Sequence, residues 1–352
     1  MLFNSLYQYS WNALEPLLRS TFKAGVLEVQ VGYAIFNIFS SIFQVIGGYI
    51  ADVKGPKIIG IFSSISSSLG FLGTYLSPNL FTFYVFWAVG SSGEGILYGI
   101  ATNLAVKWYS NRRGIAIGIV SLGFGLGATI ANPLIAKFSN AREPSLIIGL
   151  LELAILPSIL YFTDYPTSVT GRKFIEIALT KEWWLIFASY SLVLTPLLTY
   201  SSSLTEIGSS LPMSQLQLII SLFPLMSGLG RPFLGVISDR LGTMKTLLMI
   251  NSLLSLSQII VLINVFLSST LIGILGGAMI TLYFSLIGEL YGSKYSTSNI
   301  GILYAGKAIS GFLGSIAFNY IYLAGGIFYV LYLVLLSVIG TALLIICKMI
   351  YG

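Results

Sequence analysis

Two basic residues, Arg231 and Lys307, lie inside long apolar stretches of the sequence, where a charge is costly to bury. Arg231 precedes Asp239, the polar end of its stretch, by eight residues, so it lies roughly 12 Å inside that end if the stretch is helical. Lys307 lies about nine residues into its own stretch, roughly 14 Å deep by the same rise. Arginine offers a planar fork that matches a carboxylate, and lysine offers a compact point charge. The pair therefore predicts a binding site for a small carboxylate or dicarboxylate.

A buried acid, Glu94, lies in the run Gly90-Ser-Ser-Gly-Glu94-Gly. It precedes Lys107 by thirteen residues, roughly 20 Å along a helix. An unpaired carboxyl group at such a depth keeps its proton. Glu94 is predicted either to exchange a proton or to balance one of the two cations, and a packing role for a neutral glutamic acid is the alternative. For Arg231 and Lys307 the alternative is permanent pairing with buried glutamates.

Cysteine and histidine chemistry is excluded by composition. The chain has one cysteine, Cys347, and no histidine, so it has no disulfide framework, no Cys/His metal site and no histidine proton relay. It also lacks HExxH, Gly-x-Ser-x-Gly and paired buried aspartates. We therefore expect no metal, no cofactor and no enzymatic activity.

The elements that must position these residues are membrane helices. Of the 352 residues, 56% are hydrophobic and 9% charged, whereas about a quarter of a soluble domain is charged. Apolar runs of roughly 20 residues recur along the whole chain. They predict an all-α membrane protein with twelve spans, at about 1–21, 30–51, 56–77, 81–107, 112–136, 144–162, 184–204, 215–238, 243–267, 269–292, 298–323 and 325–349. Basic residues occupy short loops, so we expect membrane lipid and no nucleic acid around the protein.

One long polar linker divides the spans six from six. It predicts an N-terminal bundle over 1–162, a cytoplasmic linker over 163–183 and a C-terminal bundle over 184–352. With the N-terminus inside, the cytoplasmic side holds Lys54, Lys57, Lys107, Arg112, Arg113, Arg172, Lys173, Lys181, Arg240, Lys245, Lys294 and Lys348. The outer side holds only Arg19, Lys23, Lys137 and Arg142. The positive-inside rule thus predicts a multi-pass plasma-membrane protein with both termini in the cytoplasm.

The two halves resemble each other at a constant offset of 187 residues. The matched pairs are Gly48/Gly235, Asp52/Asp239, Gly55/Gly242, Gly90/Gly277, Lys107/Lys294, Gly114/Gly301, Gly127/Gly314 and Asn132/Asn319. Parallel repeats of six helices with a site between them are a transporter architecture. The offset pairs Arg231 with Gln44 and Lys307 with Val120, so both cations belong to the second half alone. Gln44 could donate a hydrogen bond to a carboxylate, and a polar contact between helices is the alternative.

A loop signature occurs twice and resembles that of the major facilitator superfamily, G-x-x-x-D-x-x-G. The copies are Gly48-Tyr-Ile-Ala-Asp52-Val-Lys-Gly55 and Gly235-Val-Ile-Ser-Asp239-Arg240-Leu-Gly242. Its glycines allow a tight reversal, and its carboxylate can meet a helix N-terminus or a basic residue. The resemblance implies twelve membrane helices in two pseudo-symmetric bundles, with these gating loops stabilising one access state. Val53 stands where an arginine is usual, which implies a thinner charge network in the first copy.

Further stretches resemble the branch of oxalate:formate antiporters and monocarboxylate transporters. They are Lys107-Trp108-Tyr-Ser-Asn-Arg112-Arg113-Gly114, Gly230-Arg231-Pro-Phe-Leu-Gly235 and Gly301-Ile-Leu-Tyr304-Ala-Gly-Lys307. The resemblance implies that the arginine of helix eight and the lysine of helix eleven bind the anion. It also implies aromatic side chains that face the substrate, and the candidates are Tyr9, Trp11 and Tyr98, then Tyr283 and Tyr304. With 21 tyrosines in the chain, packing is the alternative for each.

These features predict a secondary transporter of small organic anions such as oxalate, formate, lactate or pyruvate, working as a monomer by alternating access. Monocarboxylate transporters usually carry an aspartate at the position of Ser227, so the antiporter side of the branch is favoured for anion binding. Symport with a proton and exchange for another anion both remain open. The alternative is a proton-coupled transporter of another solute, such as a sugar or a drug. Glu152 ranks below Glu94 because the sixth helix is peripheral in the superfamily, and Glu15 is predicted to pair with Arg19, four residues on.

Overall fold

The computed structural model describes residues 1–109, 113–166, 171–292 and 294–351, which form helices joined by short loops. Residues 110–112, including Arg112 of the second resemblance motif, and residues 167–170 of the predicted linker lie outside these ranges. Within the described ranges, ten helical segments are long and apolar enough to cross a membrane. The prediction of an all-α membrane protein is confirmed.

The helices follow most of the predicted spans, but three spans are broken, and the span predicted at 243–267 ends at Leu262, where a short turn precedes the helix that begins at Val265. The first half contains α1 (Asn4–Tyr9), α2 (Trp11–Phe22), α3 (Val26–Lys54), α4 (Pro56–Leu76), α5 (Leu80–Trp108), α6 (Arg113–Ile135) and α7 (Arg142–Tyr161), and the short α8 (Phe174–Ile177) follows. The second half contains α9 (Lys181–Val193), α10 (Thr195–Ile207), α11 (Met213–Leu241), α12 (Thr243–Ile259), η1 (Ile260–Leu262), α13 (Val265–Tyr291), α14 (Ser296–Tyr304), α15 (Gly306–Phe312), the π-helical η2 (Leu313–Ala317), α16 (Phe318–Leu323) and α17 (Phe328–Tyr351).

Three predicted spans are broken rather than continuous. The span predicted at 1–21 breaks at Ser10, between α1 and α2. The span predicted at 184–204 breaks at Leu194 and again inside α10, where Ser203 has φ −134°. The span predicted at 298–323 passes through η2. Breaks of this kind free backbone groups that must find partners inside the protein, because a membrane offers none.

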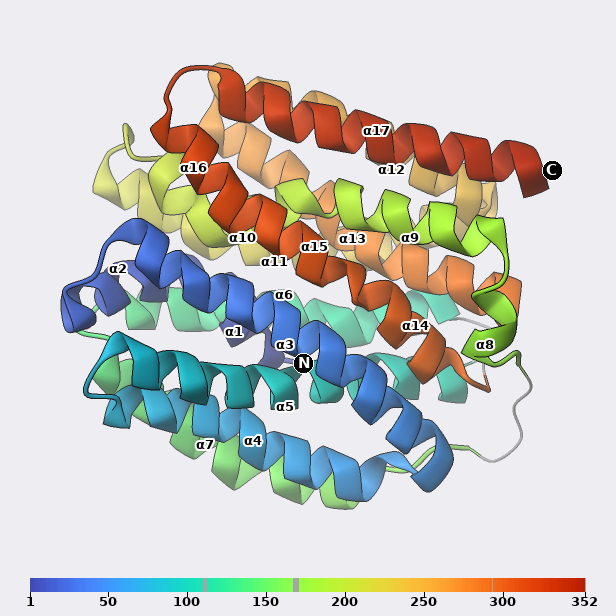
Figure 1. Cartoon of the computed structure of the whole chain (residues 1–352), viewed down its shortest axis with the longest axis horizontal. Helices are drawn as coiled ribbons and strands as arrows, with labels where there is room; N and C mark the ends of the chain where they lie inside the picture. Colours follow the sequence, from blue (N-terminus) through green and yellow to red (C-terminus); the bar gives the residue numbers. More distant parts are fainter. Residues whose placement is uncertain (110–112, 167–170, 293, 352) are drawn as a thin grey trace.

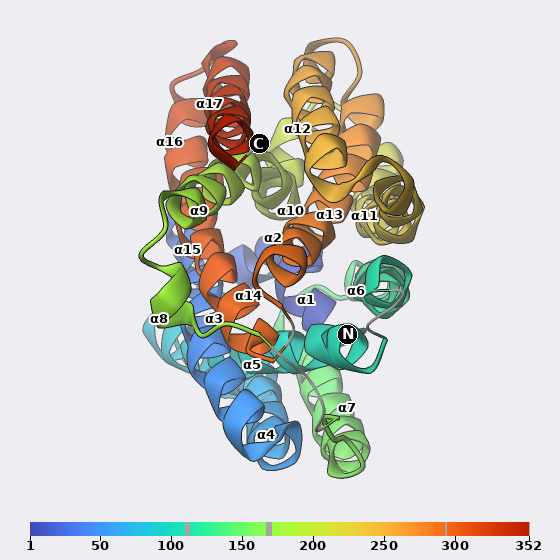
Figure 2. The same ribbon diagram turned by 90° about the vertical axis from the view of Figure 1, so that its right-hand side faces the viewer.

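The helices run side by side along one direction (Figure 1), and Figure 2 shows them close to end-on. In Figure 2, α4 and α7 lie on one side and α12 and α17 on the other. Between these layers α3 packs against α14 and α15, and α6 packs against α11. These two seams join the first half of the chain to the second. Side chains that point from these helices into the seams are therefore placed between the two halves.

The loop signature explains how two of the seam helices end. Gly55 follows α3 with φ 86° and Gly242 follows α11 with φ 89°, a region that residues with a side chain rarely adopt. In both cases the next helix begins at the following residue. Gly48 lies on the seam itself, since a Cβ there would stand 3.0 Å from the carbonyl oxygen of Thr297 in α14. The signature therefore combines a tight reversal with close helix approach.

Asn132 and Asn319, a pair matched by the repeat, each reach the broken first helix of their own half. Asn132 Nδ2 donates to the carbonyl of Tyr9 at the end of α1, at 3.1 Å. Asn319 Nδ2 donates to Ser203 Oγ at the break in α10, at 2.8 Å. Asn132 therefore satisfies a backbone carbonyl at the break between α1 and α2. Asn319 instead bonds a side-chain hydroxyl at the break in α10, so the matched asparagines contact the broken helices in different ways.

Candidate functional site

The two cations predicted to bind an anion lie one at each seam. Arg231, in α11, is 1% exposed, and its guanidinium carbon lies 5.2 Å from the ring centre of Phe124 in α6. Lys307, in α15, is also 1% exposed, and its Nζ lies 4.1 Å from the ring centre of Phe36 in α3. Each cation therefore belongs to the second half and rests on an aromatic ring of the first half. Such cation–π contacts are worth about 0.5–2 kcal/mol and do not replace a counter-ion.

The polar partners of the cations are few. Within the described part of the chain, none of the three guanidinium nitrogens of Arg231 has a hydrogen-bond partner. Lys307 Nζ donates to the hydroxyl of Tyr304 at 2.9 Å. Among the described residues, neither cation has a carboxylate oxygen within 4.0 Å. Permanent pairing with buried glutamates therefore finds no support in this arrangement, and the polar groups that face Arg231 are the hydroxyls of Tyr9 and Tyr98 rather than acids.

An aromatic group connects the two cations. The rings of Tyr98 and Tyr304 are stacked, 5.0 Å apart at 20°, and Phe124 lies edge-on to Tyr98 at 5.3 Å. Tyr9 lies edge-on to the same phenylalanine at 5.3 Å, and its hydroxyl is 2.6 Å from Ser227 Oγ. We call Tyr9, Tyr98, Phe124 and Tyr304, together with Phe36, the aromatic group. Phe36 and Phe124 were missed from sequence, because a phenylalanine has no polar handle and only its position beneath a cation marks it.

Two predicted aromatic residues lie elsewhere. Trp11 packs against Tyr33 and Trp87, with ring centres 5.5 and 5.8 Å away, in a cluster of first-half helices. The hydroxyl of Tyr283 is 2.6 Å from Ser189 Oγ, which ties α13 to α9 within the second half. Among the described residues, neither Trp11 nor Tyr283 makes a ring contact or a hydrogen bond with Arg231 or Lys307. Their substrate contact stays a prediction.

Glu94 and Gln44 are buried polar residues with unused hydrogen-bonding capacity. Glu94 Oε1 accepts a 3.4 Å hydrogen bond from Asn4 Nδ2, and Oε2 has no partner among the described residues. The carboxyl group lies within electrostatic range of Lys307, beyond ion-pair distance. Neither side-chain atom of the Gln44 amide has a described partner, and its side chain lies against Gly99 of α5. Both therefore have atoms left to serve a bound molecule or a proton.

The remaining acids that the sequence raised have local partners. Glu152 is buried in α7, where its Oε2 accepts from Ser67 Oγ of α4 at 3.0 Å. Glu15 lies 3.7 Å from Arg19 Nε, so the predicted pairing of these two residues is confirmed.

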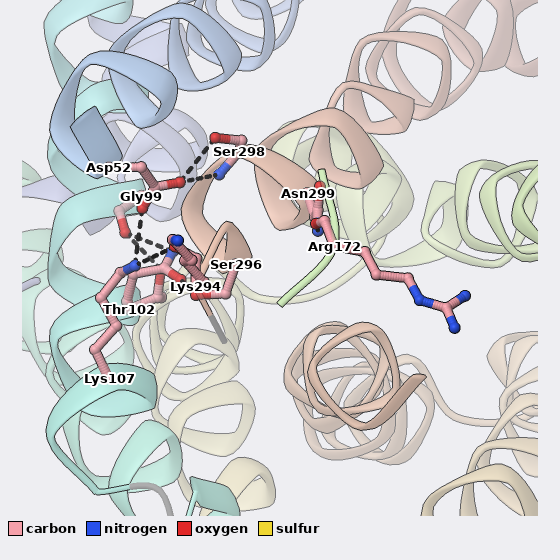
Figure 3. A network of polar contacts seen from close by, with 10 residues as sticks. Asp52, Gly99, Thr102, Lys107, Arg172, Lys294, Ser296, Ser298 and Asn299 are labelled. Atoms are coloured by element: carbon pink, nitrogen blue, oxygen red, sulfur yellow. Dashed lines mark hydrogen bonds and ion pairs between the residues drawn. The ribbon is translucent and has the colours of Figure 1, made fainter. Parts of the chain in front are cut away.

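The end of the molecule that carries the linker is closed by Asp52, Lys107, Lys294 and Ser298, which we call the linker-end seal (Figure 3). Asp52 Oδ1 lies 2.9 Å from Lys107 Nζ, and Oδ2 accepts from the backbone N and Oγ of Ser298 at 2.9 and 2.7 Å. Lys107 Nζ also donates to the carbonyl of Lys294 at 3.0 Å. A carboxylate in the first turn of α14 is favoured by the helix dipole. The seal thus joins α3 and α5 to α14 across the halves.

The second copy of the loop signature, Gly235 to Gly242, forms no such seal among the described residues. Asp239 and Arg240 are exposed at the end of α11, and Asp239 makes no hydrogen bond or ion pair to any residue that the structure describes. The linker is held to the same end through Arg172, whose carbonyl accepts from Asn299 Nδ2 at 3.0 Å (Figure 3). The duplicated aspartates therefore have different surroundings, one in a seal and one in solvent.

The opposite end is closed by Asn12, Gln30 and the broken part of α10, which we call the far-end seal. Asn12 Nδ2 donates to the carbonyls of Tyr200 and the following residue at 2.9 and 2.8 Å, and its Oδ1 accepts from the backbone N of Leu204 at 2.8 Å. Gln30 Nε2 donates to the carbonyl of Ser202 at 2.8 Å. First-half amides therefore occupy the backbone groups that the break frees. Polar contacts between the halves are thus present at both ends of the molecule, and both cations are buried between them.

Comparison with known proteins places this geometry in a family. A sequence model of the Major Facilitator Superfamily matches residues 1–213 and 184–350. An uncharacterized 38 kDa protein in the 23S RNA operon of Thermoproteus tenax is 43% identical over 327 residues, 93% of this chain and 87% of the relative. The oxalate:formate antiporter of Oxalobacter formigenes is 25% identical over 329 residues, 87% and 79% of the two chains. The crystal structure of the transporter FucP in its outward conformation superposes with a TM-score of 0.69 at 14% identity, covering 98% of this chain and 97% of FucP.

Proposed function

This chain belongs to the major facilitator superfamily, and from that premise we propose that it is a secondary transporter of small organic anions, carried by alternating access. The superfamily consists of membrane transporters rather than enzymes. The resemblance to an oxalate:formate antiporter supports mono- or dicarboxylates as the substrate class. The plasma membrane, with the linker end in the cytoplasm, is the location we propose from the distribution of basic residues.

The observation that carries the proposal is the buried guanidinium of Arg231, which has no carboxylate partner among the described residues. A buried cation without a counter-ion costs at least about 2.5–3.5 kcal/mol in a membrane. A bound carboxylate offsets that cost and accepts two parallel hydrogen bonds from the fork. Lys307 supplies the second charge, so a dicarboxylate, or a monocarboxylate with a second polar group, engages both.

The position of the cations suggests how binding is linked to movement. Arg231 lies at the seam between α6 and α11, and Lys307 at the seam between α3 and α15. An anion held by both lies across both seams, over the stacked rings of Tyr98 and Tyr304. We therefore propose that residues 1–162 and 184–352 move as two bodies joined by the 163–183 linker, and that the anion stabilises the occluded arrangement.

Glu94 and Gln44 have proposed roles on the first-half side. Glu94, within electrostatic range of Lys307, balances that charge when the site is empty. The free amide of Gln44 donates to the anion. The unpaired Oε2 of Glu94 also favours a second candidate function, a proton-coupled transporter of another small solute, in which this carboxyl group carries the proton.

Uptake into proteoliposomes tests the proposal. Labelled oxalate, formate, lactate and pyruvate are offered with an internal counter-anion, with an inward proton gradient, and with neither. We expect uptake of at least one carboxylate, abolished in Arg231→Gln and Lys307→Gln and retained in Arg240→Gln, an exposed arginine of the same helix. Stimulation by the counter-anion identifies exchange, and stimulation by the proton gradient identifies symport. Normal uptake in both cation variants, or uptake of sugars alone, would overturn the anion proposal.

A further inference from the structure

Two carboxyl groups from different halves, those of Glu15 and Glu206, lie within electrostatic range of each other just beyond the far-end seal. Asn12 of α2 is bonded to Leu204 of α10, so these two residues lie at one level. Glu15 follows Asn12 by three residues and Glu206 follows Leu204 by two, roughly 4.5 and 3 Å further along two helices that run toward the same end. The two carboxyl groups are consequently brought to nearly the same depth.

Glu15 is the more enclosed of the two. Its side chain is 1% exposed, and neither carboxyl oxygen has a hydrogen-bond partner among the described residues. The charged groups that act on it are Glu206, which opposes its charge, and Arg19, which offsets it from 3.7 Å with a side chain 43% exposed.

Glu206 is partly buried beside it. Its Oε2 accepts from Thr205 Oγ1 at 2.9 Å. Arg19 is the charged group that acts favourably on it, and the nearby hydroxyl of Tyr322 donates to the backbone carbonyl of Glu206 rather than to the carboxylate. Arg19 therefore offsets the charge of both Glu15 and Glu206. With both acids ionised, these three residues carry a net negative charge in the closed seal.

We propose that Glu15 and Glu206 form a proton-binding site that is complete only when the far-end seal is closed. Two ionised carboxylates held together away from water repel each other, and Arg19 compensates one of them. A proton on one acid removes the repulsion and lets that acid donate a hydrogen bond to the other.

Opening the far end separates α2 from α10 and hydrates both acids, so the shared proton is released. Because the closed state binds one more proton than the open state, acid favours closure. Linkage sets the size of the effect at up to about tenfold in the closed-to-open ratio per pH unit. The far end is thus a pH-sensitive seal, whatever solute the central cations bind.

The test measures the seal directly in the full-length protein. Spin labels are placed on cysteines at Lys23 and Ser209, exposed positions of the two halves at the far end, in a Cys347→Ser background. Electron–electron distances are recorded in lipid nanodiscs between about pH 8 and about pH 5, the range in which an acid pair sharing one proton titrates. No transport substrate is present, so failure of the anion proposal does not affect the result.

We expect the short-distance, closed population to grow as the pH falls. In Glu206→Gln and Glu15→Gln the closed-to-open ratio is expected to change less than about twofold over the same range, because a neutral amide neither repels nor binds the proton. Glu143→Gln, an exposed acid at the same end, and Glu94→Gln, the central acid, should keep the wild-type response. A wild-type distance distribution that does not change with pH, or a full pH response in both glutamine variants, would overturn the proposal.

Discussion

Neutralising Asp52 should open the linker end of the molecule. Asp52→Asn keeps an oxygen that can accept from Ser298 but removes the negative charge that faces Lys107 and the N-terminus of α14. The bonds to Ser298 join α3 to α14 across the halves, so they exist only while the linker end is closed, whereas the pair of Asp52 with Lys107 lies within the first half and persists on opening. Loss of the Lys107 pair therefore costs both states. The weakened bonds to Ser298 shift the conformational equilibrium.

The magnitude follows from the bonds that lose their charge. Charge-assisted hydrogen bonds contribute about 1.5–3 kcal/mol each and neutral ones about 1 kcal/mol. Two bonds of this kind run from Ser298 to Asp52 across the halves, at 2.9 and 2.7 Å. When both are retained as neutral bonds, the net loss is about 1–2 kcal/mol, a shift of roughly 5- to 30-fold toward opening, since 1.4 kcal/mol is tenfold.

Distance measurement at the linker end of the molecule, between α3 and α12, provides the assay, with labels on cysteines at the exposed positions Lys54 and Lys245. The repeat supplies a matched control, Asp239→Asn, which changes the corresponding aspartate where it is exposed. We expect long distances to dominate in Asp52→Asn and to stay at the wild-type level in Asp239→Asn. Equal shifts in the two variants, or none in Asp52→Asn, would refute the assignment of the seal.

Three further substitutions test the centre and the packing around it. Glu94→Gln should tighten anion binding about three- to tenfold, because it removes the carboxylate that balances Lys307. The same substitution should abolish any rise of uptake in acid. An unchanged affinity and pH profile would exclude both charge balance and proton transfer as roles of Glu94. Ser227→Asp places a carboxylate one turn from Arg231 and should weaken anion binding about tenfold or more. The control Ser227→Ala loses only the contact with Tyr9 and should change anion affinity less than about threefold. Equal effects of the two substitutions would argue against the Arg231 guanidinium as the binding group. Gly95→Ala would drive a Cβ into the backbone of Ser40 and should lower stability by about 1–3 kcal/mol, seen as a lower thermal unfolding midpoint in detergent. Gly123→Ala, whose Cβ would lie 3.3 Å from Met1 Cβ and 3.9 Å from the backbone nitrogen of Leu2, should change the midpoint less. Equal midpoints would refute the close approach of α3 and α5.

The helical architecture was predictable because it depends on averages over many residues. Runs of about 20 apolar residues and the 187-residue repeat gave the spans and the family. The breaks at Ser10 and Ser203 were not predicted, and side-chain amides of distant residues, among them Asn132 and Asn319, form hydrogen bonds beside them. Hydropathy carries no information on such a partner.

Which face of a helix looks toward the centre was the harder question. For Arg231 and Lys307 the charge itself predicted the orientation, because a cation within a membrane helix faces the protein interior rather than lipid. Aromatic residues gave no such guide, since a helix apolar all round shows no preferred face. Trp11 and Tyr283 consequently lie in other clusters, while Phe36 and Phe124, which no pattern marked, lie under the cations.

The role of the duplicated aspartates also depended on tertiary contacts. Asp52 and Asp239 occupy equivalent positions, yet one closes a seal and the other is exposed. The difference arises because Ser298 and Lys107 lie beside the first copy only, and their approach depends on how α14 packs against α3. A repeat identifies equivalent positions but not their partners.

The most direct test of the central claim is calorimetric titration of the purified protein with the carboxylate that uptake identifies. If Arg231 and Lys307 hold the anion together, Arg231→Gln and Lys307→Gln should each cost about 2 kcal/mol or more, roughly a 30-fold loss of affinity. The double variant should lose less than the sum, because both groups act on one ligand, and Arg240→Gln should bind as the wild type does. Wild-type affinity in both single variants would contradict the account.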